Sequence, residues 1–162
     1  MNEEKNEFPQ RLKHNTPHWV DPRSAIYHIR IRCRSNNGGT LLTDPSVAAS
    51  LLESIHFYSD LGRWWSSVFL VMPDHLHALL SFDSSREFSR IIGDWKKWHV
   101  KNTGIEWQEN FFDHRLRSTD SRAEKYTYIR QNPVRASLCS EEDNWQWWTA
   151  SDPELRWPRG DS

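Results

Sequence analysis

The chain has 162 residues, which suits a single domain, and its ten tryptophans and aromatic content of 13% argue against a disordered protein. A net charge of −1 excludes a uniformly basic nucleic-acid binder, so any phosphate-binding surface must come from local placement of arginine and lysine. With only two cysteines, a disulfide framework and a cysteine-rich metal cluster are both excluded.

The two ends of the chain differ in composition from its centre. Residues 1–22 are polar and contain three prolines, and we expect a loose N-terminal arm there. Residues 23–140 are predicted to form one domain, and residues 141–162 an acidic, tryptophan-rich C-terminal tail. No apolar run reaches membrane-spanning length, so we expect a cytoplasmic protein that does not contact a membrane.

The first predicted element is a strand over residues 25–34. Apolar residues alternate with basic ones here, and successive side chains of a strand point to opposite faces. The strand therefore has one buried face and one basic face. The basic face carries His28, Arg30, Arg32 and Arg34.

A helix is predicted next, over residues 45–59, with Asp44 as its N-cap and Pro45 in the first helical position. Two strands follow, at 64–72 and 75–82, joined by a short Pro-Asp connection. In the second of these strands, apolar residues occupy the face opposite to two histidines.

Three further elements follow along the chain. A helix over residues 86–101 places Trp95 and Trp98 on its apolar side. A strand is expected around residues 111–116. The last helix is predicted over residues 121–132, and the proline that follows it ends it.

This order of elements predicts an α+β fold. A strand, a helix, two strands, a helix and a strand suit a ferredoxin-like antiparallel sheet. The helices would cover the apolar face of the sheet, and the opposite, active-site face would stay open. The histidines and the basic row of the first strand would both lie on that open face.

His75 and His77 are the first candidate site residues. They lie two positions apart in a strand, so their imidazoles share one face while Leu76 faces the other way. Two imidazoles side by side can hold one divalent metal ion. The spacing alone is weak evidence, because a strand can also carry two surface or hydrogen-bonded histidines.

Tyr128 and Asn132 are the second pair of candidates, four residues apart on one face of the last helix. Tyr126 lies about 200° around the helix from Tyr128, on the side of Ile129, which suits the core. If the helix docks beside the histidine strand, Asn132 adds an amide oxygen to the two imidazoles. Both residues also have ordinary explanations, namely packing for the tyrosine and a helix end for the asparagine.

Together, these side chains suit the cleavage of a phosphodiester by a tyrosine. A metal ion would neutralise a non-bridging oxygen and polarise the phosphorus, which the phenolate would attack. The product is a covalent phosphotyrosine and a free hydroxyl, so the energy of the broken bond is kept for rejoining.

Four segments resemble a known family. They are residues 72–77 (Met-Pro-Asp-His-Leu-His), 107–108 (Trp-Gln), 112–117 (Phe-Asp-His-Arg-Leu-Arg) and 128–136 (Tyr-Ile-Arg-Gln-Asn-Pro-Val-Arg-Ala). In this order they resemble the single-tyrosine HUH transposases, in particular the REP-associated tyrosine transposases of the insertion-sequence-200 type. The similarity spans residues 24–140, with Ser137 at a position where the family often has glycine.

The resemblance implies a metal-dependent transposase and endonuclease that nicks and rejoins single-stranded DNA through a 5′-phosphotyrosine intermediate. It implies Tyr128 as the nucleophile and His75, His77 and Asn132 as ligands of Mg²⁺ or Mn²⁺. The DNA partner would be single-stranded, with a short hairpin beside the cleaved strand. The protein itself would be a monomer or a homodimer.

Arginines near these motifs are expected to contact DNA phosphates. The candidates are Arg30, Arg32, Arg115, Arg117 and Arg130. For Arg30 and Arg32, a solvated strand face is the alternative interpretation.

Two other functions stay open on the sequence. A domesticated relative could bind hairpin DNA without cutting it, and its binding would not need a metal. A hydrolytic metalloenzyme could use the two histidines with a bound water. The latter would lose activity in His77→Ala and keep it in Tyr128→Phe.

Overall fold

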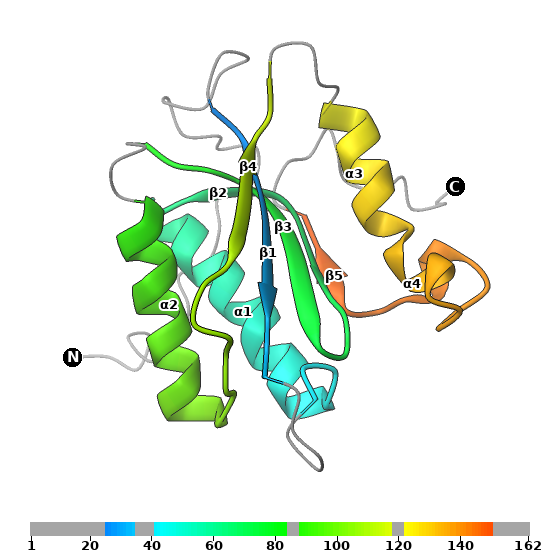
Figure 1. The fold of residues 1–162 in the computed structure, drawn as a ribbon, viewed down its shortest axis with the longest axis horizontal. Helices are drawn as coiled ribbons and strands as arrows, with labels where there is room; N and C mark the ends of the chain where they lie inside the picture. Colours follow the sequence, from blue (N-terminus) through cyan, green and yellow to red (C-terminus); the bar gives the residue numbers. More distant parts are fainter. Residues whose placement is uncertain (1–24, 35–40, 84–87, 118–121, 151–162) are drawn as a thin grey trace.

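The computed structural model of the chain describes residues 25–34, 41–83, 88–117 and 122–150 (Figure 1). The expected N-terminal arm at 1–22 and residues 151–162 of the expected tail lie outside the described residues. None of the helices in the described ranges combines the length and apolar character that crossing a membrane needs.

The described part is built on a five-stranded sheet. Its strands are β1 (Tyr27–Arg32), β2 (Trp65–Val71), β3 (His75–Ser81), β4 (Phe112–Arg115) and β5 (Trp148–Thr149). They lie in the order β4-β1-β3-β2-β5, and every neighbouring pair is antiparallel. The first four strands have the predicted ferredoxin-like order, and the predicted α+β class is confirmed.

The helices are α1 (Pro45–Asp60), α2 (Phe88–Thr103), α3 (Arg122–Arg130) and α4 (Asn132–Arg135), followed by a 3₁₀ helix at Glu142–Asn144. As predicted, α1 begins after Asp44 with a proline in its first turn. Because Pro133 has no N–H to donate, α3 stops at Arg130, and the chain resumes as α4 with that proline in its own first turn.

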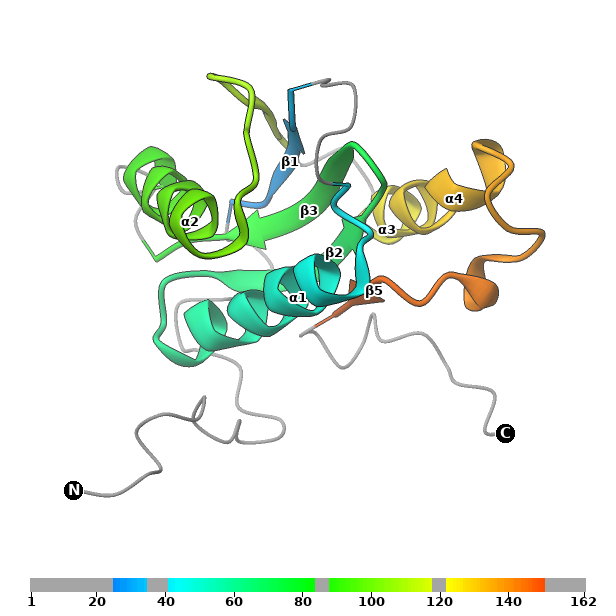
Figure 2. The ribbon, with the colours of Figure 1, turned by 90° about the horizontal axis from the view of Figure 1, so that it is seen from below.

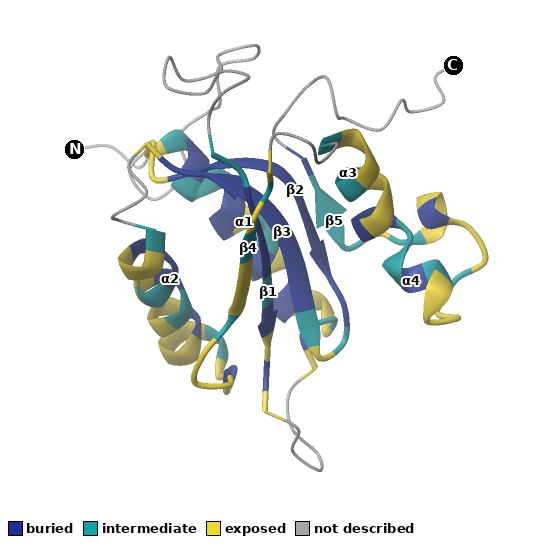
Figure 3. Cartoon of the chain, turned by 45° about the horizontal axis from the view of Figure 1, so that its top comes forward, coloured by how far each residue is buried: buried dark blue, intermediate teal, exposed yellow. Residues whose placement is uncertain are grey.

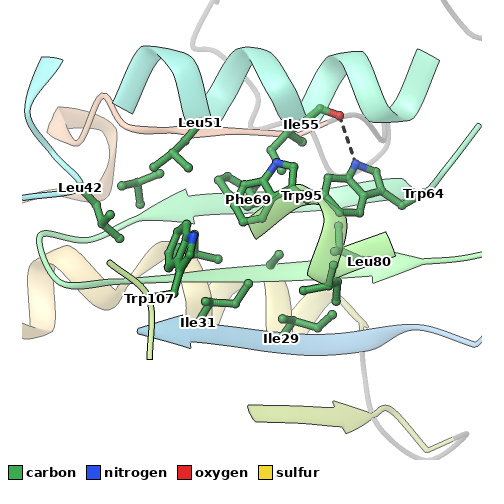
Figure 4. Packing of buried hydrophobic residues seen from close by; sticks show 14 of the residues in the cluster. Ile29, Ile31, Leu42, Leu51, Ile55, Trp64, Phe69, Leu80, Trp95 and Trp107 are labelled. Atoms are coloured by element: carbon green, nitrogen blue, oxygen red, sulfur yellow. Dashed lines mark hydrogen bonds between the residues drawn. The ribbon is translucent and has the colours of Figure 1, made fainter. Parts of the chain in front are cut away.

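One face of the sheet packs against α1 and α2 and forms the main core. The apolar residues of β1 and β3 that alternate with basic residues and histidines are buried there, as predicted. Figure 4 shows large aromatic side chains filling the space between the sheet and α1. Among them, the Trp64 indole donates a hydrogen bond of 3.1 Å to the Ile55 carbonyl, so even its polar atom is satisfied.

The buried side of α2 differs from the prediction at one position. Trp95 is 1% exposed, whereas Trp98 is 48% exposed and His99 is buried in its place. Residues four apart lie in line on a helix, so Trp95 and His99 share the inward side and Trp98 is turned away. The prediction that Trp98 lies on the apolar side is therefore wrong.

On the other face of the sheet, α3 packs over β2 and β3 (Figures 1 and 2). A second apolar cluster forms there, in which Val68, Leu70, Met72 and Leu79 meet Tyr126, Ile129 and Ala150. β2 contributes to both clusters and is buried along its whole length (Figure 3). The part of this face over β1 and the start of β3 carries four of the predicted site residues, His75, His77, Arg30 and Arg32.

The last described segment adds to the sheet, which the sequence did not predict. Trp148 and Thr149, in the expected tail, form β5 and pair with β2. In addition, the Trp145 indole donates a hydrogen bond of 3.0 Å to the Val71 carbonyl. This segment therefore closes one edge of the sheet beside α3.

Candidate metal and nucleophile site

The β2–β3 hairpin sets the positions of the two predicted metal ligands. Pro73 and Asp74 connect the strands, and the Met72 N–H donates to the His75 carbonyl at 2.8 Å. His75 and His77 then share the face away from the main core, with ring centroids 5.0 Å apart. The structure thus brings these two imidazoles together as predicted.

Each of the two imidazoles has a partner at its Nδ1 atom. Nδ1 of His75 lies 2.7 Å from a carboxylate oxygen of Asp74. Nδ1 of His77 lies 3.0 Å from Nε2 of His28 on β1. Histidines that bind metals usually have one ring nitrogen held in this way by a neighbour, which leaves the other nitrogen for the ion. This leaves Nε2 as the ring nitrogen of His75 and of His77 that could bind a metal ion.

His28 contacts the predicted ligand His77, although the sequence pattern indicates only that His28 belongs to the basic face of its strand. The pairing of β1 with β3 places Arg30 opposite His77 and Leu79 opposite His28. From that position His28 reaches diagonally to the His77 ring, a distance that long side chains on neighbouring strands can span. Alternation showed that His28 lies on this face, but its contact depends on a strand register that the sequence does not reveal.

Burial keeps the imidazoles of His28 and His77 uncharged at neutral pH. Desolvation lowers the pKa of His77 to about 3 and that of His28 to about 4, and nearby positive charges add to both shifts. Desolvation also lowers the pKa of His75, although the Asp74 carboxylate opposes the change. Neutral imidazole is the form that binds a metal, so the ligands need no deprotonation to act.

The two tyrosines of α3 lie on different sides of the helix, as predicted. Tyr126 is buried in the second apolar cluster, and Tyr128 is 50% exposed. The Tyr128 ring is flanked by the guanidinium of Arg135, 4.1 Å from the ring centroid, and by the ammonium of Lys125, at 5.9 Å.

The same two cations act on the buried histidines. The charge of Arg135 contributes to the lowered pKa of His77, and that of Lys125 to the lowered pKa of His28. The exposed phenol and the histidines thus share their charged neighbours.

Asn132 begins α4, and its carboxamide nitrogen completes the end of α3. Its Nδ2 donates to the Ile129 carbonyl at 3.1 Å, the bond that the missing N–H of Pro133 would otherwise make. The oxygen of the amide is then the atom suited to a cation. No group of three histidine, cysteine, aspartate or glutamate side chains in the described ranges is arranged to hold a metal ion.

Two of the five predicted DNA-binding arginines lie on the histidine face. The Arg30 guanidinium lies 5.0 Å above the Phe112 ring, opposite His77 in the sheet. Arg32 is exposed and lies 3.6 Å from a carboxylate oxygen of Asp74. Both residues therefore lie on the sheet face that carries His75 and His77.

The structure does not bring the other three to the same place. Arg115 lies opposite Tyr27, so it belongs to the face that carries the main core. Arg117 is exposed beyond the end of β4. Arg130 has no exposed surface, and its guanidinium lies 3.7 Å from the Trp148 ring centroid. Arg130 is thus packed within the described part of the chain, and its assignment to DNA stays a prediction.

No family model matches the chain, and no curated protein matches it either. A solved structure of a REP-associated tyrosine transposase bound to a REP hairpin is similar, with a TM-score of 0.61 and 19% sequence identity. The similarity covers 93% of this chain and 94% of that chain. At this identity, the likeness establishes a shared fold.

Proposed function

We propose that the protein is a metal-dependent, single-tyrosine endonuclease of the transposase type, which nicks and rejoins single-stranded DNA. The observation that carries this proposal is the exposed Tyr128, flanked by Lys125 and Arg135, in one small domain with the adjacent imidazoles of His75 and His77. The fold shared with a transposase that binds a REP hairpin supports hairpin-bearing DNA as the substrate.

Tyr128 is the nucleophile of the proposed reaction. Its phenol gives up a proton, and the oxygen forms a bond to the phosphorus of one phosphodiester while the bond to the 3′ oxygen breaks. The 3′ oxygen takes up a proton and leaves as a hydroxyl, and the 5′ end stays on Tyr128 as a phosphotyrosine. Attack by the 3′ hydroxyl of another strand reverses these steps and joins the ends.

The Nε2 atoms of His75 and His77 and the amide oxygen of Asn132 would hold Mg²⁺ or Mn²⁺. Bound there, the ion would offset the charge that builds up on the attacked phosphate. Nitrogen and oxygen donors together suit a divalent ion that accepts both, and the neutral imidazoles leave the ion's full positive charge for the DNA.

Positive side chains around the phenol would position the DNA. Lys125 and Arg135 flank the ring of the nucleophile, and Arg30 lies opposite His77. Cations gathered at one site can bind a phosphate strongly even though the whole chain carries a net charge of −1. The proposed chemistry thus depends on a local surface and not on overall charge.

The test is to incubate the full chain with Mn²⁺ and a set of single strands that carry hairpins, and to detect protein–DNA adducts that survive denaturation. Tyr128→Phe should form no adduct. Tyr126→Phe is the matched control, because this phenol is buried two residues away on the other side of α3, and it should still form the adduct.

Other outcomes of this assay would contradict the proposal. If no strand in the set gives an adduct with wild-type protein but hairpins still bind without metal, the protein is a non-cutting hairpin binder. If strands are cleaved equally by wild type and Tyr128→Phe, the reaction is hydrolysis by a bound water.

A further inference from the structure

We propose that His28 is a positioning residue of the metal site, which holds His77 in the tautomer that offers Nε2 to the ion. The inference rests on the proposed function, because it concerns one of the same metal ligands. It assigns a task to a buried residue that no motif identifies.

The contact between the two rings allows two arrangements of one hydrogen atom. His28 Nε2 and His77 Nδ1 are 3.0 Å apart, so one of them donates and the other accepts. If His28 donates, the proton of neutral His77 lies on its Nε2, which then has no lone pair for a metal. If His77 donates, its Nε2 has a free lone pair. Metal binding is therefore compatible only with His28 as the acceptor.

The surroundings hold His28 in place for this task. Its ring is 7% exposed and packs edge-on against the Phe112 ring, with the centroids 6.0 Å apart. The β1–β3 register fixes its distance from His77. As an acceptor, its Nε2 lone pair is directed at His77, so His28 is not itself a ligand of the same ion.

The partners of the two ligands differ in charge. His75 is held by the exposed carboxylate of Asp74, whereas His77 is held by a neutral, buried imidazole. A neutral acceptor orients His77 without placing a second negative charge beside a site that receives a phosphate. The deeper ligand is thus fixed without weakening the attraction for DNA.

The first test reads the tautomer directly. Long-range ¹H–¹⁵N correlation spectra of the metal-free full chain should show the His77 proton on Nδ1. His28→Gln keeps an acceptor and should keep this tautomer, whereas His28→Phe fills the space without an acceptor and should shift His77 toward the Nε2-protonated form. A wild-type spectrum with the proton on Nε2, or an unchanged tautomer in His28→Phe, would overturn the inference.

The second test measures Mn²⁺ affinity by electron paramagnetic resonance of the free ion. Loss of such an orienting partner typically weakens metal binding by roughly 10- to 100-fold. We expect this weakening in His28→Phe and a smaller one in His28→Gln. His56→Ala is the control, since it removes a histidine that bonds Thr149 and no metal ligand, and it should bind Mn²⁺ like wild type.

The two proposals fail in different ways. If His77→Ala binds Mn²⁺ as tightly as wild type, the metal site of the proposed function is wrong. If His77→Ala loses binding while His28→Phe does not, the metal site stands and only the role of His28 is wrong. Should His28→Phe fail to fold, the wild-type tautomer and His28→Gln still decide the question.

Discussion

Two arginines on the last helical segments show how differently one residue type can be used. Arg130 is buried, stacks on Trp148 and donates a hydrogen bond of 3.2 Å to the Glu142 carbonyl. Arg135 is exposed, stacks on Tyr128 and donates a hydrogen bond of 2.8 Å to the Tyr128 carbonyl. The first joins α3 to the C-terminal segment, and the second brings a positive charge to the proposed nucleophile.

Replacing each arginine with alanine should therefore change a different property, the stability for Arg130 and the rate of adduct formation for Arg135. Arg130→Ala should lower the free energy of unfolding by roughly 2–4 kcal/mol, because it empties a packed site. Arg135→Ala should leave stability nearly unchanged and slow adduct formation, on the order of 10²-fold, as expected for loss of a group that stabilises charge on the phosphate. Chemical denaturation and the adduct assay measure the two effects. A stable Arg130→Ala variant with a lowered adduct rate would reverse these roles.

Local periodicity in the sequence was sufficient to predict on which face of a strand or helix some individual residues lie. Alternation placed His75 and His77 on one face, and helical spacing separated Tyr126 from Tyr128. The sequence could not show that Arg130 is buried, because the covering residue, Trp148, comes eighteen positions later and in another element. Contacts between distant elements, like that of His28 with His77, depend on register and docking that no local pattern contains.

At the scale of elements, α3 is held from two sides. Its apolar side packs on β2 and β3, and its last residue, Arg130, is covered by Trp148 of β5. β5 has only two residues and exists because the edge of β2 offers backbone partners. Two residues are too few to show the alternating pattern of a strand, so the sequence predicted a tail here.

We therefore expect Trp148→Ala to loosen α3 selectively. The change removes the ring over Arg130 and much of the short strand's packing, at a cost of about 3 kcal/mol in stability. Hydrogen exchange should become faster in α3 and in β5, while α1 on the other face of the sheet keeps its protection. Equal protection of α3 in wild type and variant would mean that its contacts with β2 and β3 suffice.

At the scale of the whole molecule, the sheet divides the chain into a packing side and a chemical side. Buried histidines occur on both. On the packing side, the Ser54 hydroxyl donates to the Leu51 carbonyl at 2.7 Å and accepts from the Trp95 indole at 2.8 Å. His99 Nε2, at 2.9 Å, must then be the second donor to Ser54, because a hydroxyl has only one hydrogen to give.

This arrangement makes stability depend on pH. Desolvation lowers the pKa of His99 to about 4, as burial does for His28 and His77 on the other side of the sheet. An unfolded chain protonates these residues near pH 6.5, while the folded chain does not. Because the unfolded state then binds more protons, the free energy of unfolding falls as pH drops from 6.5 toward 4.

The variant His99→Gln isolates the contribution of His99 to this pH dependence of stability. Glutamine can still donate to the Ser54 hydroxyl, but it does not titrate, so between pH 6 and pH 4.5 the variant should lose stability less steeply than wild type. The difference in slope should approach but stay below about 1.4 kcal/mol per pH unit, the value for one whole proton. Denaturation curves at several pH values, compared at constant ionic strength, measure it. Parallel curves for the two proteins would mean that His99 takes up its proton in the folded state as readily as in the unfolded one.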